Sequence, residues 1–306
     1  SLRLTQHAQA AIGAFSLGLF NTFSQAGFKA DFTAGHSFGE LTALWAAGVL
    51  TEQDYMYLAC QRGQAMAKPV EDGFDAGAMA AVIGDTKIIV QDVAVLQDVV
   101  IANDNSSQQL VVAGSQSAIT AAVTQLTAKG HRVIPLPVSA AFHTEFVAHA
   151  QQPFAKAIDK IDFSLPNIPV FSNTTAQAHN ESVRDIKDNF KKHLLAPVRF
   201  KEQLENIYDA GGRIFIEFGP KNILTQFVND IFKDKADVVS IAVNGQANKS
   251  ADMQLRQAAV QMAVLGLSLE DIDPYVANQR PVAAVKKSPL AMKLSGASYV
   301  SDKTQQ

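Results

Sequence analysis

The sequence predicts an α/β fold in which a small sheet is inserted into a larger part of the chain. Three observations predict it. A Gly35-x-Ser37-x-Gly39 motif lies between a strand-like and a helix-like segment. Residues 78–137 follow the order β-α-β-β-α-β, which is the ferredoxin-like pattern. Later in the chain, strand and helix patterns alternate again and are joined by short turns that contain glycine.

The first predicted part of the chain ends at residue 77. Apolar side chains recur at helical spacing over Gln6–Ala26, so this stretch is predicted to be a helix. The aromatic segment Phe28–Ala34 suits a β-strand, and Leu41–Val49, rich in alanine and leucine, suits a helix. Thr51 can cap a further helix, because a threonine hydroxyl accepts a hydrogen bond from a free backbone N–H of the first turn.

Residues 78–137 are the predicted inserted subdomain. Strand patterns rich in alanine and β-branched residues surround two helical patterns, and the polar cluster Asn103–Ser107 is predicted to be a turn between two strands. The expected strands are 78–83, 99–102, 110–113 and 132–138, and the expected helices are 86–96 and 115–129. This order predicts a ferredoxin-like small subdomain.

The chain then returns to its larger part. The expected helices are 144–161, 183–195, 200–210, 222–232 and 251–267, and the expected strands are 170–173, 213–218 and 238–243. Residues 1–77 and 138–265 together are predicted to form an α/β-hydrolase-like large subdomain. After this subdomain the sequence shows no helical or strand periodicity and contains prolines and polar residues, so residues 266–306 are expected to be a C-terminal linker.

The composition is that of a globular chain. Of its 306 residues, 47% are hydrophobic and 18% are charged, and the formal net charge is −3. A disordered chain would be more polar, and no apolar run reaches the ~18 residues that span a membrane. Without a basic surplus, nucleic acid is not an expected partner. The single cysteine, Cys60, permits no internal disulfide, and the start has no signal-peptide pattern, so a cytoplasmic location is expected.

The motif around Ser37 fits a nucleophile elbow, which is a tight turn between a strand and a helix that exposes a serine hydroxyl. The backbone N–H of Phe38 and the start of the next helix would then stabilise an oxyanion. The competing interpretation is a glycine-rich turn in which Ser37 only caps the helix.

A nucleophilic serine needs a base. His143 is the best placed of the seven histidines, because it follows a predicted strand and a short connection. His36 adjoins the serine and is expected to be structural. Glu217 and Asp230 are candidates for a third triad member by sequence order only, and a backbone carbonyl could orient the imidazole instead. Four other histidines are expected at the surface: His7, His131, His149 and His179.

Six sequence blocks in a fixed order carry a family resemblance. They are Gly35–Glu40 with the following Leu41–Leu44, Gln61–Met66, Ala141–Thr144, Phe171–Asn173, Pro197–Phe200 and Glu217–Pro220. Over about residues 1–265, the chain resembles the malonyl-CoA:acyl carrier protein transacylases and the acyltransferase domains of fatty acid and polyketide synthases. The amino-acid sequence of the first block most resembles that of the acyltransferase domains of bacterial polyunsaturated fatty acid synthases.

The resemblance implies roles for single residues. Ser37 would be the nucleophile, and His143 would be its general base and acid, oriented by the backbone carbonyl of His193. Arg62 would hold the free carboxylate of a malonyl group, which a planar guanidinium fits better than a lysine does. Without the resemblance, Arg62 would be interpreted as a surface arginine of a helix. Phe142 resembles the malonyl-selecting pattern, in which a ring narrows the pocket near the α-carbon, although it also suits plain core packing.

The implied reaction moves a malonyl unit from malonyl-CoA to the phosphopantetheine thiol of an acyl carrier protein, with no permanently bound cofactor or metal. Acyl carrier protein domains and neighbouring synthase domains would be the partners, with neither nucleic acid nor membrane. A thioesterase-type serine hydrolase, a starter-unit (acetyl or acyl) transferase and a non-catalytic docking domain remain as alternatives. The family's N-terminal strand and GQG block, whose glutamine supplies an oxyanion donor, have no counterpart in the sequence. Either the sequence is a fragment of a longer protein, or another group replaces the missing donor.

Overall fold

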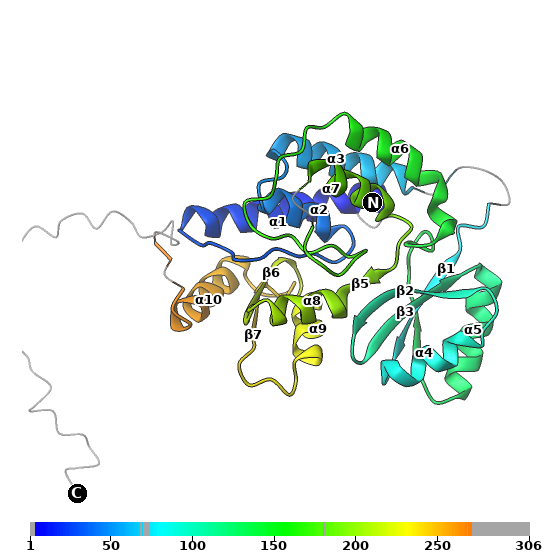
Figure 1. Cartoon of the computed structure of the whole chain (residues 1–306). Coiled ribbons are helices and arrows are strands. Elements are labelled where there is room, and N and C mark those ends of the chain that lie inside the picture. Colours follow the sequence, from blue (N-terminus) through cyan, green and yellow to red (C-terminus); the bar gives the residue numbers. More distant parts are fainter. Residues whose placement is uncertain (1–3, 68, 70–73, 180–181, 268, 271–306) are drawn as a thin grey trace, which may run out of the picture. The chain divides into compact units, whose positions relative to one another are not determined.

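A computed structural model describes residues 4–67, 69, 74–179, 182–267 and 269–270 of the chain. Helices and strands alternate along it and form one five-stranded sheet and one sheet of two parallel strands (Figure 1). The fold is therefore α/β, as predicted, and the larger sheet contains both antiparallel and parallel pairs. The expected C-terminal linker falls almost wholly outside the described residues. In the part of the chain that the structure describes, no helix combines the length and the apolar character that a membrane span requires.

Three helices begin the fold, and they confirm the predicted ones. They are α1 (Thr5–Gln25), α2 (Gly39–Ala46) and α3 (Glu52–Ala65). The hydroxyl of Thr51 accepts the N–H of Asp54 and caps α3, as expected.

The strands predicted at 28–34 and 170–173 are wrong as continuous strands. Thr33 and Val170 form one isolated parallel bridge, and Phe171 forms one antiparallel bridge with Ala178. A bend at Asp31 and the sharp turn at Ser37 leave too few extended residues for a ladder of hydrogen bonds.

The five-stranded sheet is built mainly from the predicted insertion and has the order β4-β1-β3-β2-β5. Helices α4 and α5 cover one face of it, where Ile89 and Leu126 lie in one apolar cluster with Val112 (Figure 1). The elements are β1 (Ala78–Ile83), α4 (Thr86–Ala94), β2 (Val99–Ser106), β3 (Gln109–Gly114), α5 (Gln116–Ala128), β4 (Arg132–Pro135) and β5 (Val198–Arg199).

The turn predicted at Asn103–Ser107 is wrong, because β2 continues through Ser106. Asn103 pairs with Val111 of β3, and the chain reverses only at residues 107–108. Polar composition suggested a turn, but Asn103 pairs through its backbone, and the side-chain amide of Asn105 bonds His36 and Gln109. Strand β5 pairs with β2 in parallel and so joins this sheet to a later part of the chain.

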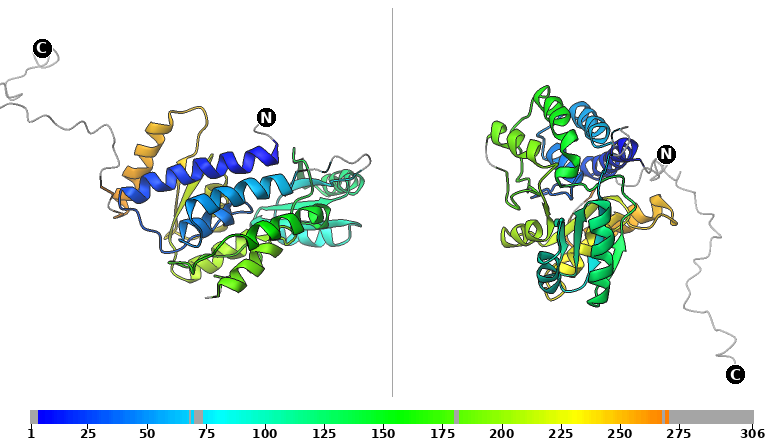
Figure 2. Two further views of the ribbon diagram at one scale, coloured as in Figure 1. Left: turned by 90° about the horizontal axis from the view of Figure 1, so that it is seen from above. Right: turned by 90° about the vertical axis from the view of Figure 1, so that its right-hand side faces the viewer.

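The second half of the larger part follows the predicted order. The helix expected from residue 144 begins as a 3-10 turn (Glu145–Val147) before α6 (Ala148–Asp159). The remaining elements are α7 (Val183–Lys192), α8 (Phe200–Asp209), β6 (Ile214–Pro220), α9 (Ile223–Ile231), β7 (Val239–Asn244) and α10 (Ala251–Val264). Strands β6 and β7 are parallel, and α1 and α10 run beside them (Figure 2).

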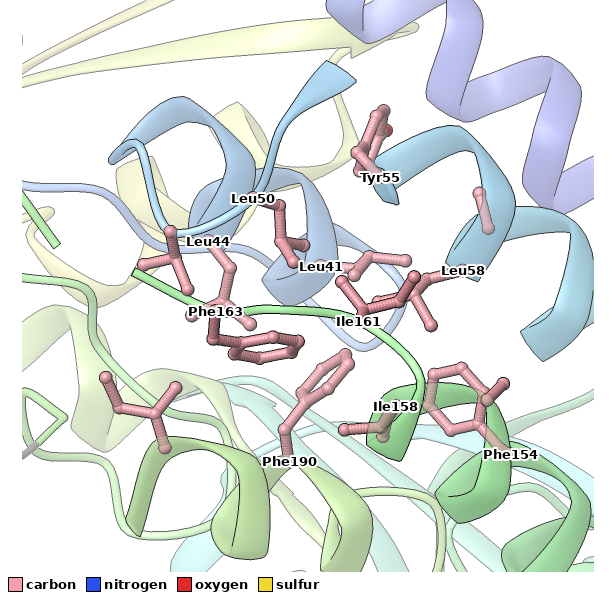
Figure 3. Close-up of a cluster of buried hydrophobic side chains, with 14 of the residues drawn as sticks. Leu41, Leu44, Leu50, Tyr55, Leu58, Phe154, Ile158, Ile161, Phe163 and Phe190 are labelled. Atoms are coloured by element: carbon pink, nitrogen blue, oxygen red, sulfur yellow. The ribbon is translucent and has the colours of Figure 1, made fainter. Parts of the chain in front are cut away.

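The largest apolar cluster lies between α2, α3, α6 and α7. Figure 3 shows side chains of α2 and α3 facing those of α6 and α7; among them are Leu41, Leu44, Leu58, Phe154 and Phe190, all fully or almost fully buried. Burial of each of these five side chains contributes ~1.5–3 kcal/mol to the free energy of folding. The cluster therefore fixes α2, and with it the turn that carries Ser37.

Candidate active site

Ser37 sits in a strained turn at the start of α2. Its φ of 52° lies in the left-handed region, which non-glycine residues rarely adopt. A Cβ at Gly35 would lie 2.0 Å from the backbone of Gly39, so only glycine fits there. The hydroxyl oxygen of Ser37 is 2.7 Å from Nε2 of His143. The elbow and the serine–histidine pair expected from the sequence are both present as geometry.

Asn173 and Glu40 hold this turn, and sequence reasoning assigned neither of them a role. The N–H of Ser37 donates to Oδ1 of Asn173 at 2.6 Å, and the side-chain amide of Asn173 donates to the carbonyl of Gly35. The backbone N–H of Asn173 donates in turn to the fully buried carboxylate of Glu40 at 2.7 Å. These bonds satisfy polar groups that the turn would otherwise leave unpaired.

The ring of His143 is oriented by backbone carbonyls. Nδ1 lies 3.2 Å from the carbonyl oxygen of His193 and 3.1 Å from that of Ala196. Because a carbonyl only accepts, Nδ1 carries the proton and Nε2 is left as an acceptor toward Ser37. The carbonyl expected at His193 is therefore in place, and Ala196 supplies a second one that the sequence did not reveal.

The acidic candidates for a triad lie elsewhere and make other contacts. The carboxylate of Glu217 accepts backbone N–H groups at the start of α9, and that of Asp230 accepts the N–H of Gln108. Both interpretations as a third triad member are therefore wrong. Sequence order could not show that each carboxylate accepts backbone N–H groups away from the serine.

Burial lowers the pKa of His143 to about 3, and the positive charge of Arg62 contributes to the shift. The side chain is 3% exposed. Desolvation disfavours the charged imidazolium, so the ring is neutral near pH 7 and can accept a proton. The pKa of His193, whose ring packs edge-on against that of His143, is also lowered well below its ordinary value by burial.

Arg62 is buried beside the serine, at 1% exposure, and not at the surface. Nη1 donates to Oε1 of Gln9 at 2.7 Å, and Nη2 donates to the hydroxyl of Ser37 at 3.3 Å. Nε is buried and has no hydrogen-bond partner among the described residues. Burial lowers the pKa of Arg62 to about 10, which leaves it charged at neutral pH. A buried cation with an unused donor, next to a nucleophile, is suited to an anionic ligand.

Phe38 and Phe142 flank the pair. Both are partly buried and pack against the cluster around α2 and α3. The ring of Phe38 lies 6.0 Å from the guanidinium carbon of Arg62, and its backbone N–H donates no bond to the described part of the chain. Phe142 also contacts two smaller apolar clusters. Phe38 N–H is thus available as an oxyanion donor.

Comparison with known proteins identifies the family. The family model described as "Acyl transferase domain" matches residues 1–271. The chain belongs to the acyltransferase family. It is 37% identical to one subunit of the polyunsaturated fatty acid synthase of Thraustochytrium sp., over 99% of this chain and 11% of that protein.

The match extends over a larger share of two shorter relatives. Malonyl CoA-acyl carrier protein transacylase of Bacillus subtilis is 35% identical, over 75% of this chain and 74% of the relative. A solved complex of a type II polyketide synthase acyl-carrier protein with its malonyl-transacylase matches with a TM-score of 0.72 and 31% identity, covering 84% of this chain and 82% of that one.

The other histidines of the acyltransferase differ in how far they are exposed. His7 is exposed, as expected. His179 is not a surface residue: its side chain is 2% exposed and its Nε2 lies 3.0 Å from Glu40. His131 lies 2.6 Å from Asp92 with an 11% exposed side chain, and His149 bonds the carbonyl of Ala67, so both are only partly exposed.

His36 has the structural role expected of it. Nε2 lies 2.6 Å from Oδ1 of Asn105, and the ring packs edge-on against Phe200. Because the amide of Asn105 donates to Gln109, its oxygen must accept from His36. Burial lowers the pKa of His36, so the ring stays neutral. Among the described residues, no group of three or more His, Cys, Asp or Glu side chains is arranged so that it could hold a metal ion.

The acyltransferase should lose stability in mild acid. The neutral rings of His36, which is half-buried, and of His143 and His193, which are buried, have pKa values lowered from the ordinary 6.5, whereas unfolded histidines bind protons below that pH. As the pH falls from 6.5 toward the folded values, the unfolded state binds more protons, and stability decreases by ~1.4 kcal/mol per pH unit for each such histidine. Urea unfolding at pH 7, 6 and 5 measures this slope; a free energy independent of pH over this interval would contradict it.

Proposed function

We propose that this acyltransferase moves a malonyl group from malonyl-CoA, through an ester on Ser37, to the phosphopantetheine thiol of an acyl carrier protein. The observation that carries the proposal is the buried guanidinium of Arg62, with one donor 3.3 Å from the Ser37 hydroxyl and another unpaired among the described residues. A malonyl thioester is an acyl group that ends in a carboxylate, and this site offers a cation at the distance such a group spans. The names of the relatives support the same substrate.

The acylation step uses the serine–histidine pair. Ser37 Oγ attacks the thioester carbon while its proton moves to Nε2 of His143, and the carbonyl oxygen becomes an oxyanion near the N–H of Phe38. Collapse of this intermediate breaks the carbon–sulfur bond, and the proton on His143 passes to the departing CoA sulfur. The backbone carbonyls of His193 and Ala196 hold the ring throughout.

Substrate binding strengthens His143 as a base. The charge of Arg62 is the second cause of its lowered pKa, after burial. A malonyl carboxylate paired with Arg62 offsets that charge, so the pKa of His143 rises toward the range in which proton transfer is efficient. A substrate without a carboxylate lacks this effect. Selection of malonyl groups would therefore act on the rate of acylation as well as on binding.

The transfer step reverses the chemistry with a new thiol. The phosphopantetheine thiol gives its proton to His143 and attacks the Ser37 ester, and the released serine oxygen recovers the proton. Phe142 lies next to His143 and narrows the space near the α-carbon of the acyl group. A ring that excludes one methyl group discriminates by ~1–3 kcal/mol, which favours malonyl over methylmalonyl groups.

We also propose the finer organisation of the chain. Residues 1–77 and 138–265 form an α/β-hydrolase-like core, and residues 78–137 form a ferredoxin-like subdomain, supported by the strand order β4-β1-β3-β2. Residues 266–306 link this unit to other parts of a cytoplasmic fatty acid or polyketide synthase. The chain covers only 11% of the synthase polypeptide that it resembles, so neighbouring synthase domains and acyl carrier protein domains are the expected partners.

Two alternatives use the same pair of residues. A thioesterase-type hydrolase would release the acid to water, and a starter-unit transferase would carry acetyl or simple acyl groups. In both alternatives the substrate has no carboxylate that would pair with the buried charge of Arg62, although burying that charge costs free energy. Arg62 therefore favours transfer of a carboxylated unit.

The test is intact-protein mass spectrometry of the full-length protein that contains this chain. The protein is incubated briefly with malonyl-CoA, acetyl-CoA or methylmalonyl-CoA, and an acyl carrier protein is then added. We expect a malonyl adduct that disappears as the carrier protein gains the same mass. Free malonate without a lasting adduct would indicate a hydrolase, and an acetyl adduct in excess of the malonyl one would indicate a starter-unit transferase.

A further inference from the structure

Gly13 lies in the middle of α1, where a glycine is unfavourable. A glycine inside a helix destabilises it by ~1 kcal/mol relative to alanine. Helix α1 contains a second internal glycine, Gly18, which is exposed and whose added Cβ would meet no atom within 4 Å. Gly13 is buried, and its added Cβ would lie 2.8 Å from Oη of Tyr55 and 3.0 Å from Cζ of Phe38. Close approach therefore requires the glycine at 13 and not at 18.

The two neighbours of Gly13 differ in how freely they can move. Tyr55, labelled in Figure 3, is fully buried, and its ring stacks on Trp45 with centroids 5.4 Å apart. Its hydroxyl is 2.9 Å from that of Thr42. Phe38 is only partly buried, and the described contacts fix its ring by packing alone. An added methyl group at position 13 is therefore expected to displace the ring of Phe38 or the helix α1 itself, and not Tyr55.

Both displacements reach Arg62. The ring of Phe38 lies 6.0 Å from the guanidinium carbon of Arg62. Helix α1 carries Gln9, one turn before Gly13, and Oε1 of Gln9 accepts Nη1 of Arg62 at 2.7 Å. Gly13 is thus linked to the guanidinium of Arg62 in two ways. A Cβ at this position would crowd the ring of Phe38, and Gly13 shares helix α1 with Gln9.

We propose that Gly13 is a specificity-determining position. The space left by its missing side chain sets where the Phe38 ring and the Arg62 guanidinium lie, and hence how strongly the site prefers an acyl group that carries a carboxylate over one that does not. This inference rests on the proposed malonyl transfer. Gly13 itself touches no substrate; it acts as a positioning residue through Phe38 and Gln9.

The test compares Gly13→Ala with Gly18→Ala in the full-length protein. Each variant adds one methyl group to the same helix, and kcat/KM is measured for malonyl-CoA and for acetyl-CoA with a carrier protein as acceptor. Gly13→Ala should lower the malonyl value roughly tenfold and reduce the malonyl-to-acetyl ratio, because small misplacements of a binding group are costly. Gly18→Ala should keep the ratio and raise the melting temperature.

A rescue variant separates crowding from general damage. In the double variant Gly13→Ala/Phe38→Leu, the Cζ atom that the added methyl group would crowd is absent. Adding Gly13→Ala to Phe38→Leu should therefore change the malonyl-to-acetyl ratio less than adding Gly13→Ala to the native protein. An undiminished change in the Phe38→Leu background would overturn the route through Phe38. An unchanged malonyl-to-acetyl ratio in Gly13→Ala, whether both thioesters lose activity equally or neither does, would overturn the inference. So would failure of both Gly13 variants to fold while Gly18→Ala folds, since the glycine would then serve packing alone.

The outcomes for the native protein separate this inference from the proposed function. If the native protein forms no malonyl ester on Ser37, the proposed function fails and the inference fails with it. If the ester forms and Gly13→Ala keeps the native ratio, the inference alone fails.

Discussion

Ser37→Ala should abolish formation of the acyl ester and all transfer to a carrier protein. The substitution removes the only atom proposed to bond the acyl carbon, while the pocket and the oxyanion donor remain. Alanine keeps the Cβ, so the strain of the left-handed backbone at φ 52° is unchanged and the variant should fold. Loss of a triad-type nucleophile typically lowers kcat by ~10⁶-fold. Intact-protein mass spectrometry after brief incubation with malonyl-CoA measures it.

A matched control for this variant is Ser117→Ala, which removes an exposed hydroxyl on α5. Its adduct should equal that of the native protein. A malonyl adduct that persists in Ser37→Ala would show that another side chain is acylated, and it would refute Ser37 as the nucleophile. Circular dichroism of both variants confirms that any loss is chemical.

If malonyl transfer is the function, as proposed, Arg62→Ala should remove the preference for malonyl groups and allow simple acyl groups. The guanidinium offers an Nε that is unpaired among the described residues and a donor near Ser37, so a carboxylate would lose about two charged hydrogen bonds. At ~1.5–3 kcal/mol each, this loss corresponds to a fall of at least ~100-fold in kcat/KM for malonyl-CoA. The value for acetyl-CoA should stay constant or rise, because the vacated space no longer holds a cation.

Arg62→Lys provides the control of equal charge. Lysine keeps the positive charge but lacks the planar pair of donors, so it should recover only part of the malonyl preference. The measurement is the ratio of kcat/KM for the two thioesters. If Arg62→Ala leaves this ratio unchanged, Arg62 does not bind the carboxylate, and a structural role for the buried charge would have to replace that interpretation.

Local sequence patterns predicted most of the secondary structure. The insertion is the clearest case: each expected helix and strand between Ala78 and Pro135 exists, with errors only at the ends. The extended length of β2 was missed, because Asn103 and Asn105 favour turns by composition and are held in a strand by tertiary contacts. Propensity carries no information about such contacts.

The candidate site was predictable only where a motif carried it. The elbow at Ser37 has a short local signature, and the family blocks pointed to His143 and Arg62. Glu40 and Asn173 lie in two of the family blocks, but no role could be assigned to them, and Gln9 had no signal at all. Each acts through contacts with residues far away in the sequence; Asn173 and Ser37, for example, are 136 positions apart. The burial of His179 was missed for the same reason.

The pairing of β2 with β5 has a consequence for building chimeras. Residues 78–137 are contiguous and look exchangeable between related acyltransferases. Yet Asn103 and Asp104 of β2 pair in parallel with Val198 and Arg199, which directly follow the segment whose carbonyls orient His143. A transplanted segment would pair there with a β5 strand from another parent, and the altered pairing would tilt the imidazole of His143. Recombination junctions should therefore carry residues 78–137 and 193–200 from the same parent.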